Sequence, residues 1–507
     1  GQWEDSARSS GFFCYGLLEA HSNQFRLVVD KRSAEPIYYR QLGNLLYFAP
    51  EAKALARLQG VSNSLNMAAV GALLGHGHLL NHQSMFSGIN RLGGGTELRI
   101  ADGQCKLHVY WEYLPGIEAR SESEAAQVAE LGDLVEQSVI AATEGPEKTV
   151  VFLSGGYDSR AILGSALKGS DTPVSTVTWG MDETHPGTDG YVARELANRT
   201  GCEHVFLPRS VEHYGAWFEE ANHLIDAQSD VAAHHPQEFQ LMSQLKSMGY
   251  RKVVRGDEAF GWRWRAYNTT SAFGNVRVKP FKDVLRIGSF INREACNEIA
   301  DANQAEFDRV WKRCSELPPN IAKDHLYFNH RLQTYLGSAS YYKQVLHQQI
   351  NPLLSDEILA FMRRVPESLR VEKALFSRVV QTRYAKFLDV PIASEDGLED
   401  WGELVYTDTP VRRYMAEQIS DEGSAIWSIF SRDKIVSAFE RKNSESATEA
   451  GRNLRETLYD MARSGLEQYA PALHDHFRGK NSLVRGPSNV AVLSRFLVLK
   501  HLCDKYL

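Results

Sequence analysis

The 507-residue chain is too long for one hydrophobic core, so its length predicts two domains. Its net charge of -7 argues against general nucleic-acid binding and against binding to membrane surfaces, because both require a basic face. The chain has no run of about 18 apolar residues that would predict a membrane span. The six cysteines are scattered without CxxC spacing, which is typical of buried thiols in a reducing cytosol, so we expect a cytoplasmic protein.

The first hundred or so residues are predicted to be rich in β-structure. Strand-like segments at 25–30, 37–40 and 45–48 are followed by a short helix over 52–58, and a further strand pattern ends at Tyr110-Trp111. The Gly43-Asn44 pair fits a hairpin turn between two of these strands. The Pro-Gly, Arg, Ser and Glu residues of 115–124 suit a linker. Apolar residues then recur at helical spacing, from Ala126 to Val139.

From Thr149 the pattern changes to alternating strands and helices. Strands are predicted at 149–153, 174–179, 204–207 and 252–254, with helical segments between them. This βαβαβ order predicts an α/β fold with a doubly wound parallel sheet, whose ligands bind at the carboxyl ends of the strands. The remainder, from about Phe281, is predicted to be mostly helical.

The first of these strands runs directly into a glycine loop at a helix start. Two glycines allow close approach of a phosphate, and the free N–H groups of the first helical turn favour an anion. The lysine of a Walker A motif is missing, which favours holding a departing pyrophosphate over γ-phosphoryl transfer. The alternative is a plain strand-to-helix turn with a capping side chain. The loop comprises Ser154, Gly155, Gly156, Tyr157, Asp158 and Ser159.

A second acidic step follows the strand at 252–254. Gly256, Asp257 and Glu258 stand where this strand would meet the same crevice as the loop. We expect Asp158 and Asp257 to hold Mg²⁺ together with phosphate oxygens, with Glu258 as a further candidate ligand. The alternative for Asp257 is N-capping of a following helix.

These two motifs together resemble the SGGxDS and GxDExFGG motifs of the asparagine synthetase superfamily. Weaker similarities keep the family's order along the chain: residues 30–39 resemble DRxGxxPLYY, 48–55 resemble FASExKAL, 88–95 resemble GIxRLxPG, and the last helix is similar over 492–507. The resemblance implies a glutaminase-type Ntn domain over 1–117, expected here as a partial β-rich sandwich. It further implies an adenylating ATP pyrophosphatase (PP-loop) domain over 118–507 with a helical C-terminal extension.

The chemistry that the resemblance implies is amide-bond formation by a ligase of biosynthesis. ATP with Mg²⁺ would activate a small-molecule or peptide carboxylate as acyl-AMP, pyrophosphate would leave, and an amine or ammonia would attack. The nucleotide-binding residues would be Leu153, Thr178, Gly256 and the loop from Ser154 to Ser159, and the catalytic residues Asp158, Asp257 and Lys373. Lys373 corresponds to the KxxLR lysine, although the arginine is displaced to Arg378. Lys386 is a weaker candidate for the same charge-stabilising role.

Several departures from the family leave alternatives open. The family's glutaminase domains use an N-terminal cysteine as nucleophile, whereas this chain starts at Gly1 without the family's first strands, and Cys14 in its strand-like run is no substitute. We therefore expect a truncated domain without glutamine hydrolysis, unless a partner chain or a homodimer supplies the segment. The family's PFLD acid is displaced to Asp356. The alternatives are a glutamine-dependent amidotransferase whose glutaminase segment is missing, and a degenerate ATP-binding scaffold.

Three further features also have two interpretations. Asp189 could contact substrate or magnesium, or act as a helix N-cap. Tyr341 and Tyr342 could supply a phenol for acid–base work or pack in the core. The segment from Trp262 to Arg265 could recognise a carboxylate or form a surface helix.

Overall fold

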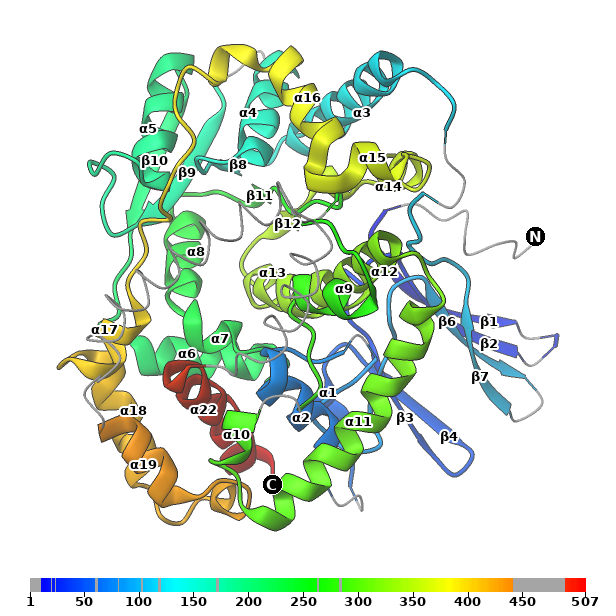
Figure 1. Ribbon diagram of the computed structural model, residues 1–507, viewed down its shortest axis with the longest axis vertical. Helices are drawn as coiled ribbons and strands as arrows, with labels where there is room; N and C mark the ends of the chain where they lie inside the picture. Colours follow the sequence, from blue (N-terminus) through cyan, green and yellow to red (C-terminus); the bar gives the residue numbers. More distant parts are fainter. Residues whose placement is uncertain are drawn as a thin grey trace.

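The computed structural model describes residues 11–440 and 488–507, apart from short gaps at 20, 23, 60–62, 81, 102–103, 117–119, 170–172, 262–263 and 282–284. Within this part of the chain, two small antiparallel sheets, one parallel sheet and a large helical body are joined into one molecule (Figure 1). None of the described helices is both long and apolar enough to cross a membrane.

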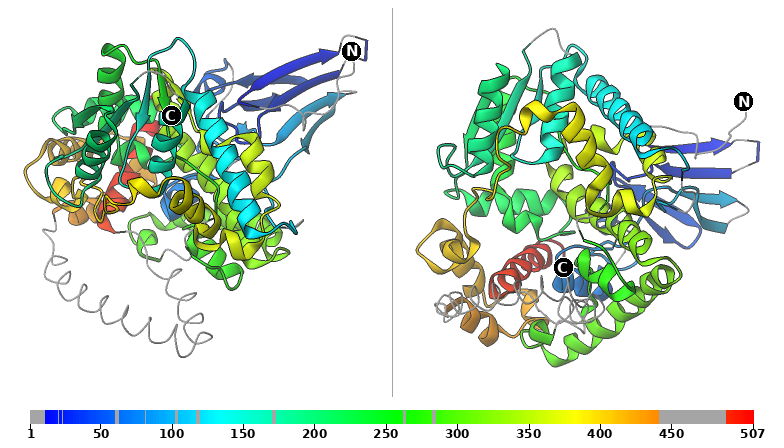
Figure 2. Two further views of the ribbon diagram at one scale, coloured as in Figure 1. Left: turned by 90° about the horizontal axis from the view of Figure 1, so that it is seen from above. Right: turned by 45° about the horizontal axis from the view of Figure 1, so that its top comes forward.

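The N-terminal part consists of two antiparallel sheets with orders β1-β2-β6-β7 and β4-β3-β5. Leu27, Val29 and Leu98 of the first sheet pack in one small apolar cluster with Ile37 and Leu92, which adjoin strands of the second. Figure 2 shows the first sheet, in blue, extending away from the helical body. The strands are β1 (Cys14–Glu19), β2 (Gln24–Val29), β3 (Tyr38–Leu42), β4 (Leu45–Ala49), β5 (Asn90–Arg91), β6 (Thr96–Ala101) and β7 (Gln104–Val109).

The parallel sheet has the order β10-β9-β8-β11-β12, and all its neighbouring strands run parallel. The chain winds outward from β8 in one direction and then in the other, so the topological switch point lies between β8 and β11. In such sheets the ligand crevice opens at this point. The strands are β8 (Thr149–Phe152), β9 (Ser175–Gly180), β10 (Glu203–Pro208), β11 (Lys252–Val254) and β12 (Gln348–Ile350).

Helices cover both faces of this sheet. Val150 and Val253 pack against α8, whereas their neighbours Val151 and Val254 pack on the opposite side with α3, α4 and α5. The alternation follows from the two-residue period of a strand and explains why these strands are apolar throughout. The covering helices are α3 (Glu124–Thr143), α4 (Tyr157–Gly169), α5 (Asp189–Thr200) and α8 (Gln237–Ser247).

The other helices build the body below and beside the sheet (Figure 1). A second large apolar cluster joins α2 and α6 to the last helix, α22. These helices are α1 (Ala52–Ala56), α2 (Met67–His76), α6 (Tyr214–Leu224), α7 (Val231–His234), α9 (Thr269–Asn275), α10 (Leu285–Gly288), α11 (Arg293–Ser315), α12 (Pro319–Leu326), the π-helix η3 (Tyr327–Leu336), α13 (Gly337–Gln344), α14 (Asp356–Met362), α15 (Glu367–Arg370), α16 (Ala374–Arg383), α17 (Trp401–Tyr406), α18 (Pro410–Ser420), α19 (Arg432–Glu440) and α22 (Asn489–Tyr506).

The predicted fold class, a β-rich N-terminal part followed by a doubly wound parallel sheet and a helical extension, is confirmed. In the parallel sheet, one strand was missed. β12 has only three residues and the polar sequence Gln-Gln-Ile, so no apolar run marks it, and only its pairing with β11 makes it a strand. The domain boundary predicted between residues 117 and 118 lies outside the described residues and stays a prediction.

Candidate functional site

The glycine loop joins the carboxyl end of β8 to the first turn of α4. Ser159 lies in that turn, and its hydroxyl donates to the carbonyl of Ser154 at 2.8 Å, closing the loop. A Cβ on Gly155 would lie 2.4 Å from the Cβ of Ala393, so a side chain does not fit there. A Cβ on Gly156 would meet only Ser154 Oγ, at 3.7 Å. The first glycine therefore permits close packing, and the second leaves open space beside the helix start, where anions bind.

A buried arginine holds the back of this loop in place. The guanidinium of Arg160 donates to the carbonyl of Gly155 at 3.0 Å. It also donates to the carbonyls of Phe387, Val390 and Pro391, at 2.5, 2.6 and 2.9 Å. Its side chain is fully buried without a carboxylate partner among the described residues. Arg160 therefore ties the loop to the segment after α16.

Asp189 occupies one of the loop's backbone donors. The N–H of Gly155 donates to Asp189 Oδ1 at 2.6 Å. Burial raises the pKa of Asp189, and the hydrogen bond from Gly155 opposes this. The N-cap of α5 is Thr188, whose hydroxyl accepts from the N–H of Tyr191, so the capping role considered for Asp189 belongs to its neighbour.

Lys373 joins the two acidic motifs. Its ammonium lies 3.1 Å from Asp158 Oδ2, in the loop, and 2.7 Å from Glu258 Oε1, after β11. The second oxygen of Glu258 accepts the backbone N–H of Phe260, so both of its oxygens are engaged. No helix begins between Arg255 and Gly261, which removes the N-capping interpretation of Asp257.

The charge and the backbone of Lys373 are both unusual. Burial acts to lower the pKa of its ammonium, but Glu258 and Asp158 outweigh burial and raise that pKa above its ordinary value. Lys373 therefore remains protonated at neutral pH. Its φ is 57° and that of Glu372 is 58°, so two consecutive non-glycine residues lie in the left-handed region. Each such residue costs about 1–3 kcal/mol and persists only where its surroundings enforce it.

Asp158 and Asp257 line a common cavity of about 380 Å³ at the ends of β8, β9 and β11. The described residues contain no group of three or more His, Cys, Asp or Glu side chains arranged to hold a metal. A protein nevertheless typically supplies only one or two carboxylate ligands to Mg²⁺, and phosphate oxygens and waters complete the coordination shell. These two residues therefore fit a magnesium–phosphate group.

The cavity unites most of the predicted nucleotide-binding residues. Leu153, Ser154, Ser159, Thr178 and Gly256 all line it, and the hydroxyl of Thr178 donates to the carbonyl of Leu153. Gly155, Gly156 and Tyr157 form the adjoining backbone of the loop. Lys373, which contacts both Asp158 and Glu258, lies just outside the cavity lining, as does Glu258.

Sequence reasoning missed several charged residues of this cavity. Arg255 lies 3.4 Å from Asp257, and its place at the end of β11 could have identified it. Lys343 also lines the cavity and pairs with Glu238. Lys343 belongs to α13, for which the sequence contains no motif.

Other candidates lie elsewhere. Lys386 is exposed and packs over the ring of Phe387, so it does not reach the cavity. Arg378 pairs with Glu124 of α3. Asp356 forms an ion pair with Lys31 at 3.1 Å.

Within the described residues, the hydroxyls of the two tyrosines of α13 donate to backbone carbonyls. Tyr342 is fully buried and donates to the carbonyl of His235 at 3.0 Å, which favours the packing role. Tyr341 donates to the carbonyl of Pro50 at 3.4 Å. Trp262 and Arg263 lie outside the described residues.

The six cysteines are free thiols. Burial raises the pKa of every one of them, that of Cys14 to about 11. A nucleophilic cysteine requires the opposite shift, so none of these thiols is activated by its surroundings.

Similar solved structures include a U34-tRNA thiolase, NcsA, from Methanococcus maripaludis with its [4Fe-4S] cluster. It is 10% identical, with a TM-score of 0.24 over 62% of this chain and 78% of that one. NMN synthetase from Francisella tularensis is 16% identical, with a TM-score of 0.20 over 48% of this chain and 94% of that one.

Two curated relatives come from Bacillus subtilis (strain 168). Asparagine synthetase [glutamine-hydrolyzing] 2 is 26% identical over 225 residues, which are 40% of this chain and 30% of the relative. Asparagine synthetase [glutamine-hydrolyzing] 3 is 20% identical over 219 residues, which are 40% of this chain and 35% of the relative. This chain thus spans about a third of the length of the relatives that it matches.

Family models cover most of the chain. Residues 4–111 match the glutamine amidotransferase domain, and residues 130–467 match asparagine synthase. The second match alone spans more than half of the chain and contains the glycine loop, the acidic step after β11 and Lys373. The chain therefore belongs to the asparagine synthase family.

Proposed function

We propose that this chain is an AMP-forming amide ligase. It would use ATP to adenylate a substrate carboxylate, release pyrophosphate, and pass the acyl group to an amine or ammonia. The observation that carries this proposal is the bridge of Lys373 between Asp158 and Glu258 beside the nucleotide cavity. The bridge places one fixed cation where two strand ends and the phosphate loop meet.

The loop and the two aspartates have distinct parts in this proposal. The free N–H groups at the start of α4 bind phosphate oxygens, and Gly156 leaves the room for them. Asp158 and Asp257 would hold Mg²⁺, which supplies charge neutralisation to the departing pyrophosphate when bound. Asp189 gives up the N–H of Gly155 when a phosphate oxygen takes its place.

Lys373 acts as a fixed positive charge. Because its pKa is raised, it does not serve as a general base at neutral pH. It stabilises instead the negative charge that develops during acyl transfer, in the manner of a preorganised electrostatic group. Glu258 is in this account a positioning residue, since its two oxygens hold Lys373 and the N–H of Phe260.

The source of the amine distinguishes two forms of this function. The match of residues 4–111 to the glutamine amidotransferase domain supports a glutamine-dependent form. The raised pKa values of all six thiols support the form in which these cysteines release no ammonia from glutamine. We favour the second form, with the amine supplied as a separate substrate or as part of the carboxylate substrate.

Carboxylate-dependent exchange of labelled pyrophosphate into ATP tests the proposal. We expect exchange with at least one acid of a substrate panel, and we expect Asp158→Asn to reduce it by at least about a hundredfold. Asp408→Asn serves as the control, because Asp408 is an exposed residue whose ion pair is with the likewise exposed Arg413. ATP binding without exchange for any acid would show a scaffold instead, and release of ammonia from glutamine would overturn the favoured form.

A further inference from the structure

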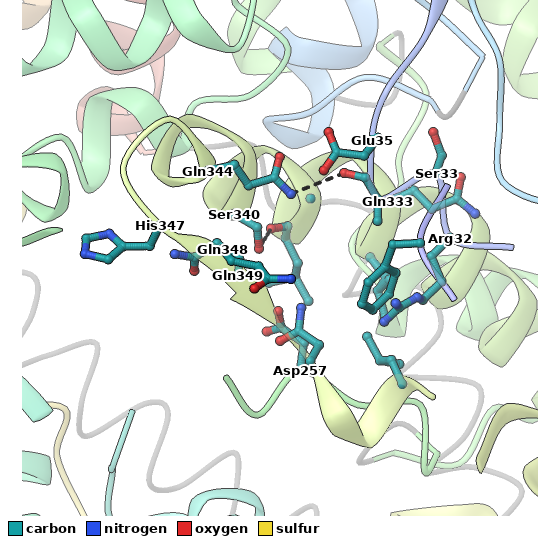
Figure 3. Close-up of a pocket in the computed structure, with 17 residues that line it drawn as sticks. Arg32, Ser33, Glu35, Asp257, Gln333, Ser340, Gln344, His347, Gln348 and Gln349 are labelled. Carbon is teal, nitrogen blue, oxygen red and sulfur yellow. Dashed lines mark hydrogen bonds between the residues drawn. The ribbon is translucent and has the colours of Figure 1, made fainter. Parts of the chain in front are cut away.

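A second cavity of about 340 Å³ adjoins the nucleotide cavity and shares Asp257 and Leu336 with it. It is lined by residues 32–35, which follow β2, and by residues of the π-helix η3, α13 and β12. Figure 3 shows Arg32 and Gln333 on one side of this cavity, with Gln348 and Gln349 opposite and Asp257 below them. We call it the amide cavity.

Arg32 is a buried cation without a carboxylate partner in the described chain. Its residue is 7% exposed, and one face of its guanidinium stacks on the ring of Phe12, 3.7 Å from the centroid. Burial lowers the pKa of Arg32 to about 10, and Asp30, Asp356 and Asp257 act in the opposite direction. At that pKa the guanidinium stays charged at neutral pH.

Each of these three carboxylates is engaged elsewhere. Asp30 accepts the backbone N–H groups of Arg32 and Ala34, at 2.8 and 3.1 Å. Asp356 pairs with Lys31 and Asp257 with Arg255. A buried charge is costly unless it is paired, so Arg32 is preorganised to receive an anion from the cavity.

The amide groups of the same cavity also have unused hydrogen-bonding capacity. Within the described residues, Gln349 has no partner for either its amide nitrogen or its amide oxygen, and Gln333 has none for its nitrogen. Gln333 is 2% exposed and Gln349 8%. The Oδ1 of Asn351 is likewise without a partner. Buried polar groups are normally satisfied, so this concentration in one cavity indicates a polar ligand.

We propose that the amide cavity binds the amine substrate, and that this amine carries an anionic group, a carboxylate or a phosphate, which Arg32 holds. This inference rests on the proposed amide ligase function. The amide groups would hold the body of the molecule, and its amine would reach the nucleotide site past Asp257. Ammonium by itself is a poor ligand here, because the buried Arg32 repels a cation.

The transfer step follows from this arrangement. The amine nitrogen forms a bond to the acyl carbon, and the bond between that carbon and the AMP oxygen breaks. AMP leaves with the electron pair, and the nitrogen releases its proton to solvent water. The anionic group on Arg32 takes no part in the chemistry and orients the amine.

Three matched probes test the cavity by isothermal titration calorimetry of the whole chain without ATP. β-Alanine and O-phosphoethanolamine carry an amine two carbons from a carboxylate or a phosphate, and ethylamine carries no anion. We expect binding of β-alanine or O-phosphoethanolamine but not of ethylamine, and the better probe identifies the anion. Arg32→Gln should weaken that binding at least about tenfold, since a lost charged hydrogen bond is worth this much.

A second cavity variant and a surface control show whether a loss of probe binding is specific to the amide cavity. Gln349→Leu loses no hydrogen bond to the described protein, so it should fold and still weaken probe binding. Arg413→Gln, at an exposed site, should bind the probes normally. The inference is overturned if neither anionic probe binds, or if ethylamine binds as well as they do. Unchanged probe binding in Arg32→Gln and Gln349→Leu would also overturn it.

Failure of the inference can be told from failure of the ligase proposal. Pyrophosphate exchange uses ATP and a carboxylate without the amine, so Arg32→Gln should leave it unchanged. Loss of exchange in Arg32→Gln would place the adenylated acid, and not the amine, on Arg32. AMP production with ammonium chloride as efficient as with either anionic amine would also contradict the inference. If no acid supports exchange, the ligase proposal fails. Probe binding is measured without ATP, so its dependence on Arg32 is decided independently of the ligase proposal.

Discussion

The ammonium of Lys373 lies 2.7 Å from the carboxylate of Glu258, although the two residues belong to segments far apart in the chain. Lys373 reaches Glu258 from a left-handed backbone position at the start of α16, and Glu258 follows β11. The contact therefore depends on docking α16 against the switch point of the parallel sheet.

Replacing Lys373 by Met should lower turnover by about 10²–10³, because the site loses its fixed charge at the transition state. Amide formation, measured as AMP release with a competent acid and amine, gives the readout. Lys373→Arg keeps the charge and should retain part of the activity. Equal activity of the wild type and Lys373→Met would contradict the assigned role, and a thermal unfolding curve shows whether the variant is folded.

Arg160→Met should lower the free energy of unfolding by about 2–5 kcal/mol. The variant removes charged hydrogen bonds and leaves the buried carbonyls of Phe387 and Val390 without their donors. Urea denaturation followed by circular dichroism measures the change. Arg413→Met, at an exposed site, should change stability by no more than about 0.5 kcal/mol. A similarly small effect at Arg160 would show that the loop does not depend on this clamp.

Stability should fall as the pH is lowered from about 6.5 to about 4. His76 has a pKa lowered by burial to about 4, and that of His78 lies well below its ordinary value for the same reason. A histidine whose pKa is depressed by folding contributes stability at pH values above its pKa in the unfolded state, near 6.5. This stability is lost as the pH falls through its pKa in the folded state. The Nε2 atoms of both rings are buried without hydrogen-bond partners in the described part of the chain, so protonation would bury unpaired charge.

Denaturation curves at several pH values test this dependence. His76→Gln removes one of the titrating rings and should flatten the loss of stability between pH 6.5 and 4. His21→Gln, in an exposed turn, should lose as much stability over this pH range as the wild type does. An unchanged pH dependence in His76→Gln would show that other groups cause the acid instability.

Tyr342→Phe should leave pyrophosphate exchange unchanged and cost about 1 kcal/mol of stability. The hydroxyl donates to the backbone carbonyl of His235, so the change removes this buried hydrogen bond. Exchange and AMP release measure the activity, and thermal unfolding measures the stability. A large loss of activity at full stability would restore the acid–base role that the sequence left open.

The amino-acid sequence determined the phosphate loop, the fold class and the family by itself. These features are local: a continuous apolar run marks β8, glycines mark the loop, and the apolar spacing after Tyr157 marks α4. The loop and the acidic step after β11 are each short enough to be recognised from consecutive residues. For the same reason the strands at β9, β10 and β11 were predicted within one or two residues.

Only the tertiary structure decided which distant side chains meet. The role of Lys373 needed its contact with Asp158 and Glu258, and Lys386, of the same residue type, proved to be exposed. β12 exists because β11 supplies its hydrogen-bond partners. The amide cavity combines residues near β2 with residues of η3 and β12, and Asp30, Asp356 and Asp257, which lie near Arg32, are engaged by other groups of the described chain. Burial and pairing are properties of contacts between segments, so local sequence patterns do not encode them.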